Sequence, residues 1–317
     1  QPAAKELNVK SLTLAHFVAI AKTSGIHIPA KNNNKHYKNL NRFFTPLWQL
    51  VDDLLPKSKS ETDNKVIDEL KKLSFILDND LQAASINDCY RGPGRVTSDV
   101  LSASFPWLSF ANSRLEPYAG LFDLINKFNI GRVANELKEL LNRVDNKGAE
   151  ILENDERLSK LYTLIGHIDE EQKEDDVEAY ACLKTLPIWK TGDGLSTLDD
   201  ALLPGDFDDP IGQAKLLDAA LFCPESSAFE FIERKLGVKR QNLEEYVQKV
   251  VPQFFKGDGP QDIDQYKCLL LVLARHPQLL DDDETSSMLA KTRLVPRSDG
   301  GWRPAYMLYF RSDELVN

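Results

Sequence analysis

The sequence predicts an α+β protein in which α-helices dominate, arranged as tandem helical-bundle-plus-β-hairpin repeats in an elongated array. Three observations predict this fold. Apolar residues recur at helical spacing over most of the 317 residues, short apolar runs flank turn pairs at three places, and both patterns return after about 110 residues. The composition, 42% apolar and 28% charged, excludes global disorder and a Cys-rich scaffold.

Three β-hairpins are expected, each after the end of a helix. They cover residues 73–90, 186–203 and 294–310. Each contains a pair of residues that favours a tight turn, and these pairs are Asn79-Asp80, Asp193-Gly194 and Asp299-Gly300. The pairs lie 114 and 106 residues apart. A lysine ends the helix before each hairpin, where it suits the negative end of the helix dipole.

A helical motif recurs with a similar period. It consists of a phenylalanine, an isoleucine three positions later on the same helix face, a basic residue, and then Gly or Asn at the expected helix end. Its copies begin at Phe17, Phe122 and Phe229, at spacings of 105 and 107 residues. We therefore divide the chain into three units, 1–90, 91–203 and 204–317, and expect 115–200 and 222–307 to share one topology.

Several of these stretches resemble the repeats of sacsin-type proteins. They are Leu-Pro-Ile-Trp at 186–189 with Gly-Asp-Gly at 192–194, the helix end at 236–238, and the stretch 294–304. Sacsin-type proteins are very large chaperone-like assemblies that also carry Hsp90-like ATP-binding modules. The resemblance implies a scaffold segment of such a chaperone. The Asn-x-x-x-Asp helix, DxGxG stretch and Gly-rich lid of that nucleotide site have no match in this sequence, so any ATP site is expected elsewhere.

Protein binding is therefore the expected function, without catalysis, cofactor or metal in this segment. The expected partners are clients, chaperone partners and neighbouring domains of the parent chain. Trp189 and Trp302 lie at similar places in two hairpins and are the candidate partner-binding residues, because exposed tryptophans often anchor interfaces. The alternative is that both rings pack on the helical layer.

Two other functions stay open. One is an enzyme whose site is assembled from distant residues, which would need a deep pocket holding a titratable group with a strongly shifted pKa. The other is a rigid spacer between ATP-binding modules, which would bind no client.

Charge and hydropathy bear on partners and location. The net charge is −10, which argues against nucleic acid or an anionic membrane as partner because both would repel the chain. No apolar run is long enough to span a membrane. The four widely spaced cysteines are expected to be reduced core residues, which favours a cytoplasmic location. Both ends look cut, so we expect a segment of a longer protein.

The remaining polar candidates favour structural roles. The acidic run 281–284 fits a helix N-cap better than a cation site. Asp206, Asp208 and Asp209 lack the glycine and bidentate glutamate of a calcium loop. The histidines, His16, His27, His36, His167 and His276, show no metal-binding spacing.

Overall fold

A computed structural model of the chain describes residues 12–26, 36–56, 60–142, 152–207, 209–212, 214–223, 226–255, 259–260, 262–297 and 300–307, with backbone only over 36–42. Helices dominate and the strands form small separate sheets, so the predicted mainly α, α+β class is confirmed. The chain divides into two compact units, Gln1–Val177 and Glu178–Asn317. The division into 1–90, 91–203 and 204–317 stays a prediction, and its first border falls inside a strand at Cys89–Arg91.

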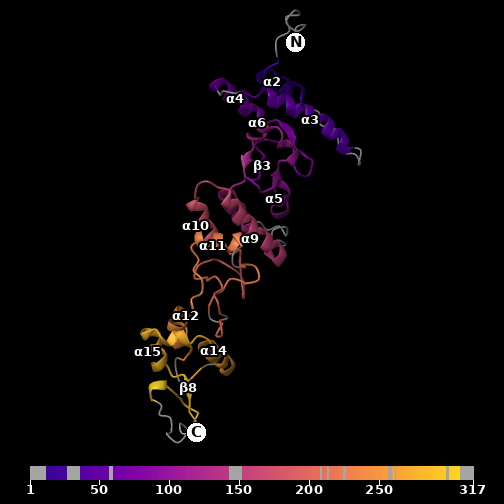
Figure 1. Cartoon of the computed structure of the whole chain (residues 1–317). Helices are drawn as coiled ribbons and strands as arrows, with labels where there is room; N and C mark the ends of the chain where they lie inside the picture. Colours follow the sequence, from indigo (N-terminus) through magenta and orange to yellow (C-terminus); the bar gives the residue numbers. More distant parts are fainter. Residues whose placement is uncertain are drawn as a thin grey trace, which may run out of the picture. The chain divides into compact units, whose positions relative to one another are not determined.

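The first unit begins with three helices that lie together (Figure 1), because α2 contacts α4 and residues of all three belong to one core cluster. Its helices are α2 (Leu14–Ser24), α3 (His36–Leu54), α4 (Glu61–Leu70), α5 (Ser98–Ser104), η1 (Ser113–Leu115), α6 (Ala119–Phe122), α7 (Ile130–Asn142) and α9 (Asp155–Glu170). Its strands are β1 (Ser74–Leu77), β2 (Ala83–Ser85), β3 (Cys89–Arg91), β4 (Ser109–Phe110) and β5 (Asn126–Lys127).

Two small sheets connect these helices. Strands β1 and β2 are antiparallel, which confirms the first predicted hairpin. A second sheet has the order β4-β3-β5 with both pairings parallel, and the sequence analysis did not expect it. Parallel neighbours need a crossover connection, and here α5 joins β3 to β4 while η1 and α6 join β4 to β5. An isolated antiparallel bridge between Asp78 and Ala111 ties the hairpin to this sheet.

In the second unit, α12, α14 and α15 gather near the last hairpin (Figure 1). Its helices are α10 (Val177–Thr185, which starts at the unit border), α11 (Ser227–Arg234), α12 (Leu243–Lys249), α13 (Val251–Phe254), α14 (Ile263–Arg275), η2 (Pro277–Leu280), α15 (Asp283–Lys291) and η3 (Ala305–Met307). Its strands are β6 (Trp189–Thr191), β7 (Gly194–Ser196), β8 (Val295–Pro296) and β9 (Trp302–Arg303).

Both expected hairpins of this unit form, because β6 pairs with β7 and β8 with β9, each antiparallel. The second turn comprises Gly192 and Asp193, one residue earlier than predicted, since Thr191 pairs with Gly194. In the third turn Asp299 lies outside the described residues, and Gly300 takes the positive φ that a tight turn requires.

The hydrogen bonds around the first two hairpins match one another, about 110 residues apart. In each case three carbonyls each accept one amide from further along the chain, over 2.8 to 3.2 Å. The first carbonyl lies near the end of the preceding helix, the second in the first hairpin strand and the third in the strand after the hairpin. The matching pairs are Asn87→Lys71 with Leu198→Lys184, Asn112→Leu77 with Asp218→Lys190, and Phe128→Arg91 with Gln241→Leu203. Parallel bridges from Leu202 to Leu216 and from Leu203 to Arg240 repeat the β4-β3-β5 arrangement.

The helix before the third hairpin ends like the other two. A buried leucine carbonyl accepts the amide three residues on, and the pairs are Leu73→Leu70, Leu186→Leu183 and Thr292→Leu289. An alignment on these bonds places Lys184 opposite Ala290, one position from the lysine match proposed from the sequence, which stays a prediction. The segments 115–200 and 222–307 each run from a short helix through further helices to a hairpin, but β5 in the first and α13 and η2 in the second have no described counterpart, so their common topology stays a prediction.

A buried charge stabilises the first unit. The Glu136 side chain on α7 is 1% exposed and pairs with Arg132 at 2.5 Å. Its other oxygen accepts a hydrogen bond from the Trp107 indole at 2.8 Å. The Arg132 guanidinium lies 5.1 Å from the centre of the Tyr90 ring, on the parallel sheet. One carboxylate therefore joins α7 to the segment between α5 and β4. None of the described helices has the length and hydropathy needed to cross a membrane.

Replacing this carboxylate is expected to destabilise the first unit. Glu136→Ala should lower the free energy of unfolding by about 3 kcal/mol, because it removes the partner of a partly buried guanidinium and one acceptor of Trp107. Glu136→Gln, which keeps an acceptor, should cost less. Urea unfolding followed by circular dichroism measures both. Lys65→Ala, which removes an exposed ion pair to Glu61, is the control, and an equal loss in that variant would contradict the role of burial.

Candidate functional site

Trp189 is a core residue. Its side chain is 1% exposed and its indole N–H donates to the Leu183 carbonyl at 2.9 Å. The ring lies 6.4 Å from that of Phe222, which is also buried. Trp189 therefore packs inside the protein, as the alternative to a partner-binding role required. A partner could not reach this ring without opening the unit.

Trp302 is only half-buried. Its ring lies 4.9 Å from Tyr266 in an edge-on contact and 6.2 Å from Phe255. Gly259 has a φ of 142° and passes so close to the indole that a Cβ there would collide with it. The Val295–Arg303 register places Trp302 on the second strand of its hairpin, whereas Trp189 lies on a first strand. The two tryptophans are therefore not equivalent positions.

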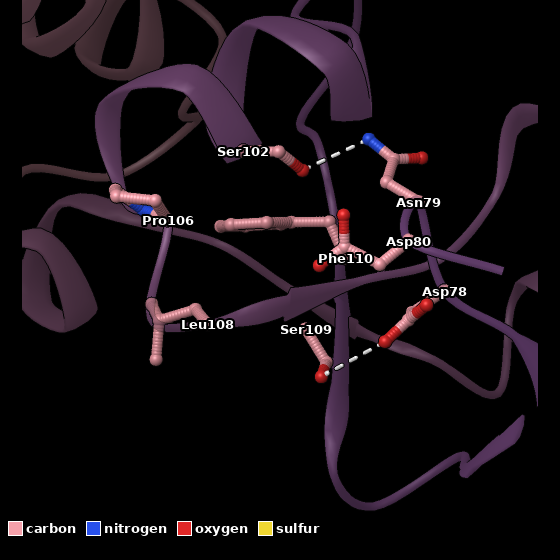
Figure 2. Close-up of a pocket in the computed structure, with 8 residues that line it drawn as sticks. All are labelled: Asp78, Asn79, Asp80, Ser102, Pro106, Leu108, Ser109 and Phe110. Carbon is pink, nitrogen blue, oxygen red and sulfur yellow. Dashed lines mark hydrogen bonds between the residues drawn. The ribbon is translucent and has the colours of Figure 1, made fainter. Parts of the chain in front are cut away.

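A small polar pocket of about 80 Å³ opens at the first hairpin turn (Figure 2). Asn79 donates to Ser102 at 2.9 Å and Ser109 donates to Asp78 at 3.4 Å, and the ring of Phe110 lies between these two pairs in Figure 2. The volume is below the roughly 300 Å³ of a typical small-molecule site. The pocket can hold a few waters, but not a substrate of ordinary size.

Asp78 is the titratable group of this pocket. Burial raises the pKa of its carboxyl, although the carboxylate accepts the Gln82 amide at 2.7 Å. At the matching position of the second hairpin, the Thr191 hydroxyl donates across its turn to the Gly194 carbonyl at 2.9 Å. Both side chains therefore hold a turn closed. Burial also raises the pKa of the neighbouring Cys89 thiol to about 12, which keeps it protonated and poorly nucleophilic.

An apolar opening lies in the second unit. It has a volume of about 440 Å³ and lies between α14, η2, α15 and η3. Its lining, which we call the apolar groove, comprises Leu270, Leu273, Ala274, His276, Leu279, Leu280, Ser286, Leu289, Ala290, Leu294 and Ala305. Leu270 and Leu280 remain 38% and 60% exposed. Nothing in the sequence pattern distinguished these leucines from core residues, because Leu270 continues the helical periodicity of α14 and Leu280 ends an apolar pair in η2.

The acidic candidates have the structural roles that the sequence favoured. Asp282 caps α15 by accepting the Thr285 amide at 2.6 Å. The Asp209 carboxylate accepts three amides of its own loop, from Ile211, Gly212 and Ala214, and the Tyr246 hydroxyl at 2.5 Å. Asp208 lies outside the described residues. Within the described part of the chain, no group of three His, Cys, Asp or Glu side chains could hold a metal ion.

The histidines and cysteines do not assemble into a site either. His16 closes the N-terminal capping box of α2 with Thr13, His167 lies 3.3 Å from Glu170, and His276 follows α14. Of His27 and His36 no side chain is described. All four cysteines are free, and only Cys89 is buried. The prediction that all four are core residues is wrong for Cys223 and Cys268, which are exposed on a loop and on α14.

Asp78→Asn is expected to change the pH dependence of stability. A raised pKa in the folded state means that folding favours the protonated acid, so this contribution is lost as pH rises from the ordinary value of 3.8 through the folded-state pKa. Asparagine keeps an acceptor for Gln82 and does not titrate. The urea midpoint of the variant should therefore increase relative to that of the wild type as pH rises from 3.5 to 7. Parallel profiles, or the same gain in the exposed turn variant Asp193→Asn, would contradict this assignment.

The two tryptophans should differ in stability. Trp189→Ala is expected to lower the free energy of unfolding by about 4 kcal/mol, since it empties a core position and frees the Leu183 carbonyl. Trp302→Ala should cost about 2 kcal/mol, because its ring is half-exposed. Urea unfolding monitored by circular dichroism compares them, and the reverse order would show that the third hairpin depends more on its tryptophan.

The chain was compared with models of protein families, with curated protein sequences and with solved structures, and no match was found in any of them.

Proposed function

We propose that this chain is a non-catalytic protein-binding scaffold segment of a sacsin-like cytoplasmic chaperone, and that the apolar groove is where a partner binds. The groove carries the proposal. It is a hollow of about 440 Å³ whose lining is mostly leucine and alanine. Exposed contiguous apolar surface of this kind is costly in water and typically marks a site that another chain covers.

The groove has the geometry of a side-chain pocket. Leu289 at its base is nearly buried within a cluster that includes Tyr266, Leu269 and Leu279. Leu270 and Leu280 on its rim are exposed. An apolar partner side chain that entered would lose its own hydration and cover these rim leucines, which is how a few anchors supply most of an interface's binding energy.

We also propose that the chain consists of three tandem units, 1–90, 91–203 and 204–317. The matched hydrogen bonds around the hairpins and the three matching helix ends support this proposal. In the first two cases the hairpin is bonded both to the helix before it and to the strand after it. Units linked in this way add along the chain, which would give an elongated array.

The enzyme alternative has one structural feature in its favour, the raised pKa of Asp78 in a pocket. The pocket's volume of about 80 Å³ and the matching turn role of Thr191 favour a structural function for it. The spacer alternative predicts no binding at the apolar groove, so the same experiment distinguishes it from the scaffold.

The test is an aggregation-suppression assay with the full chain, a heat-labile client and no nucleotide. We expect suppression near stoichiometric amounts, and Leu280→Glu should raise the amount required by about threefold or more, because it places a charge on the groove rim. Leu271→Glu is the matched control, since Leu271 lies on α14, is 58% exposed and does not line the groove. A folded chain that gives no suppression would favour the spacer.

A further inference from the structure

In each of the first two proposed units, residues of the last helix or the hairpin pack together with residues of a helix that follows the hairpin. After the first hairpin, Leu70 and Leu77 share a core cluster with Leu121 and Ile125, which belong to α6 and the residues just after it. After the second, Tyr180 on α10 contacts the ring of Phe231 on α11, 5.9 Å away. Helices α6 and α11 are equivalent elements, because each precedes the last strand-like segment of its parallel arrangement.

The apolar groove is the same surface in the third unit. The helix-end hydrogen bonds pair Leu183 with Leu289 and Leu186 with Thr292. The next backbone bond agrees, since Ile188→Leu186 matches Leu294→Thr292. On this alignment the positions of Tyr180, Leu183 and Ile188 are those of Ser286, Leu289 and Leu294, and all three of the latter line the groove.

We infer that the apolar groove is a docking site for an amphipathic helix of the α11 type, in which one aromatic side chain enters the space that Phe231 fills against α10. This inference rests on the proposed function and names the class of partner. It follows because α11 packs on α10 through Phe231, and the four-residue helix α6 shares a core cluster with the first hairpin, whereas in the third proposed unit the described residues leave the matching surface open.

The composition of the groove sets the chemistry of the partner. Where α10 has Tyr180, α15 has Ser286, which removes a ring from the wall of the space. An aromatic residue is therefore the side chain that fits, and an aliphatic one three or four positions away would cover Leu270 or Leu280. In α11 the corresponding buried residues are Ala228, Phe229, Phe231 and Ile232.

The experiment measures binding of a fluorescein-labelled peptide of residues 226–238 to the full chain by fluorescence anisotropy. We expect saturable binding that weakens about tenfold or more when the peptide carries Phe231→Asp, and likewise when the chain carries Leu270→Glu. Leu271→Glu should leave affinity within about twofold, because this exposed neighbour on α14 does not line the groove. Circular dichroism confirms that each chain variant is folded.

Three outcomes would overturn the inference. These are no binding of the peptide, equal weakening by Leu270→Glu and Leu271→Glu, and self-association of the chain that Leu270→Glu abolishes without any peptide binding, which would make a second copy the occupant. Failure of the inference is separable from failure of the proposed function. A chain that suppresses client aggregation but does not bind the peptide remains a protein-binding segment, with a different class of partner.

Discussion

The hydrogen bond from the Asn87 amide to the Lys71 carbonyl, with its match from Leu198 to Lys184, anchors each hairpin to the end of the preceding helix. The helix end and the hairpin both depend on this hydrogen bond. The last carbonyls of a helix have no N–H donor inside the helix, and an isolated two-stranded hairpin is barely stable in water. One bond thus satisfies the helix end and fixes the hairpin, and the short parallel strands that follow can then form against a rigid neighbour.

The elements that depend only on neighbouring residues in the sequence were predictable. The three hairpins follow from turn residues between apolar runs, and the α15 start follows from its acidic cap. The exact turn residues were less so. In the first turn Leu81, and not Asn79 or Asp80, takes the positive φ of 59°. A residue that is partly buried in the core can accept this strained conformation because its packing offsets the cost.

The parallel strands and the burial of Trp189 were not predictable from the sequence. Strands of two or three residues, such as β4 and β5, are too short to show an alternating pattern, and their pairing depends on segments far away in the chain. Trp189 and Trp302 each follow or flank a turn, so their sequence contexts look alike. They differ because Phe222 and the Leu183 carbonyl close over one ring, while the other meets Tyr266 at the edge of its unit.

The apolar groove could not be predicted from the sequence, for a related reason. A leucine that will be covered by a partner has the same helical spacing as one covered by its own chain. What distinguishes Leu270 and Leu280 is the set of small residues opposite them, Ser286, Ala290 and Ala305. On the proposed alignment, the matching positions of 91–203 have Tyr180, Lys184 and Leu198, which carry larger side chains. In the proposed unit 204–317, a buried leucine lies at the base of the groove and smaller side chains surround the hollow. Such an exposed apolar surface keeps its shape in water because the neighbouring core supports it. Covering it removes apolar area from water, and an aromatic side chain from another segment would bury the most area.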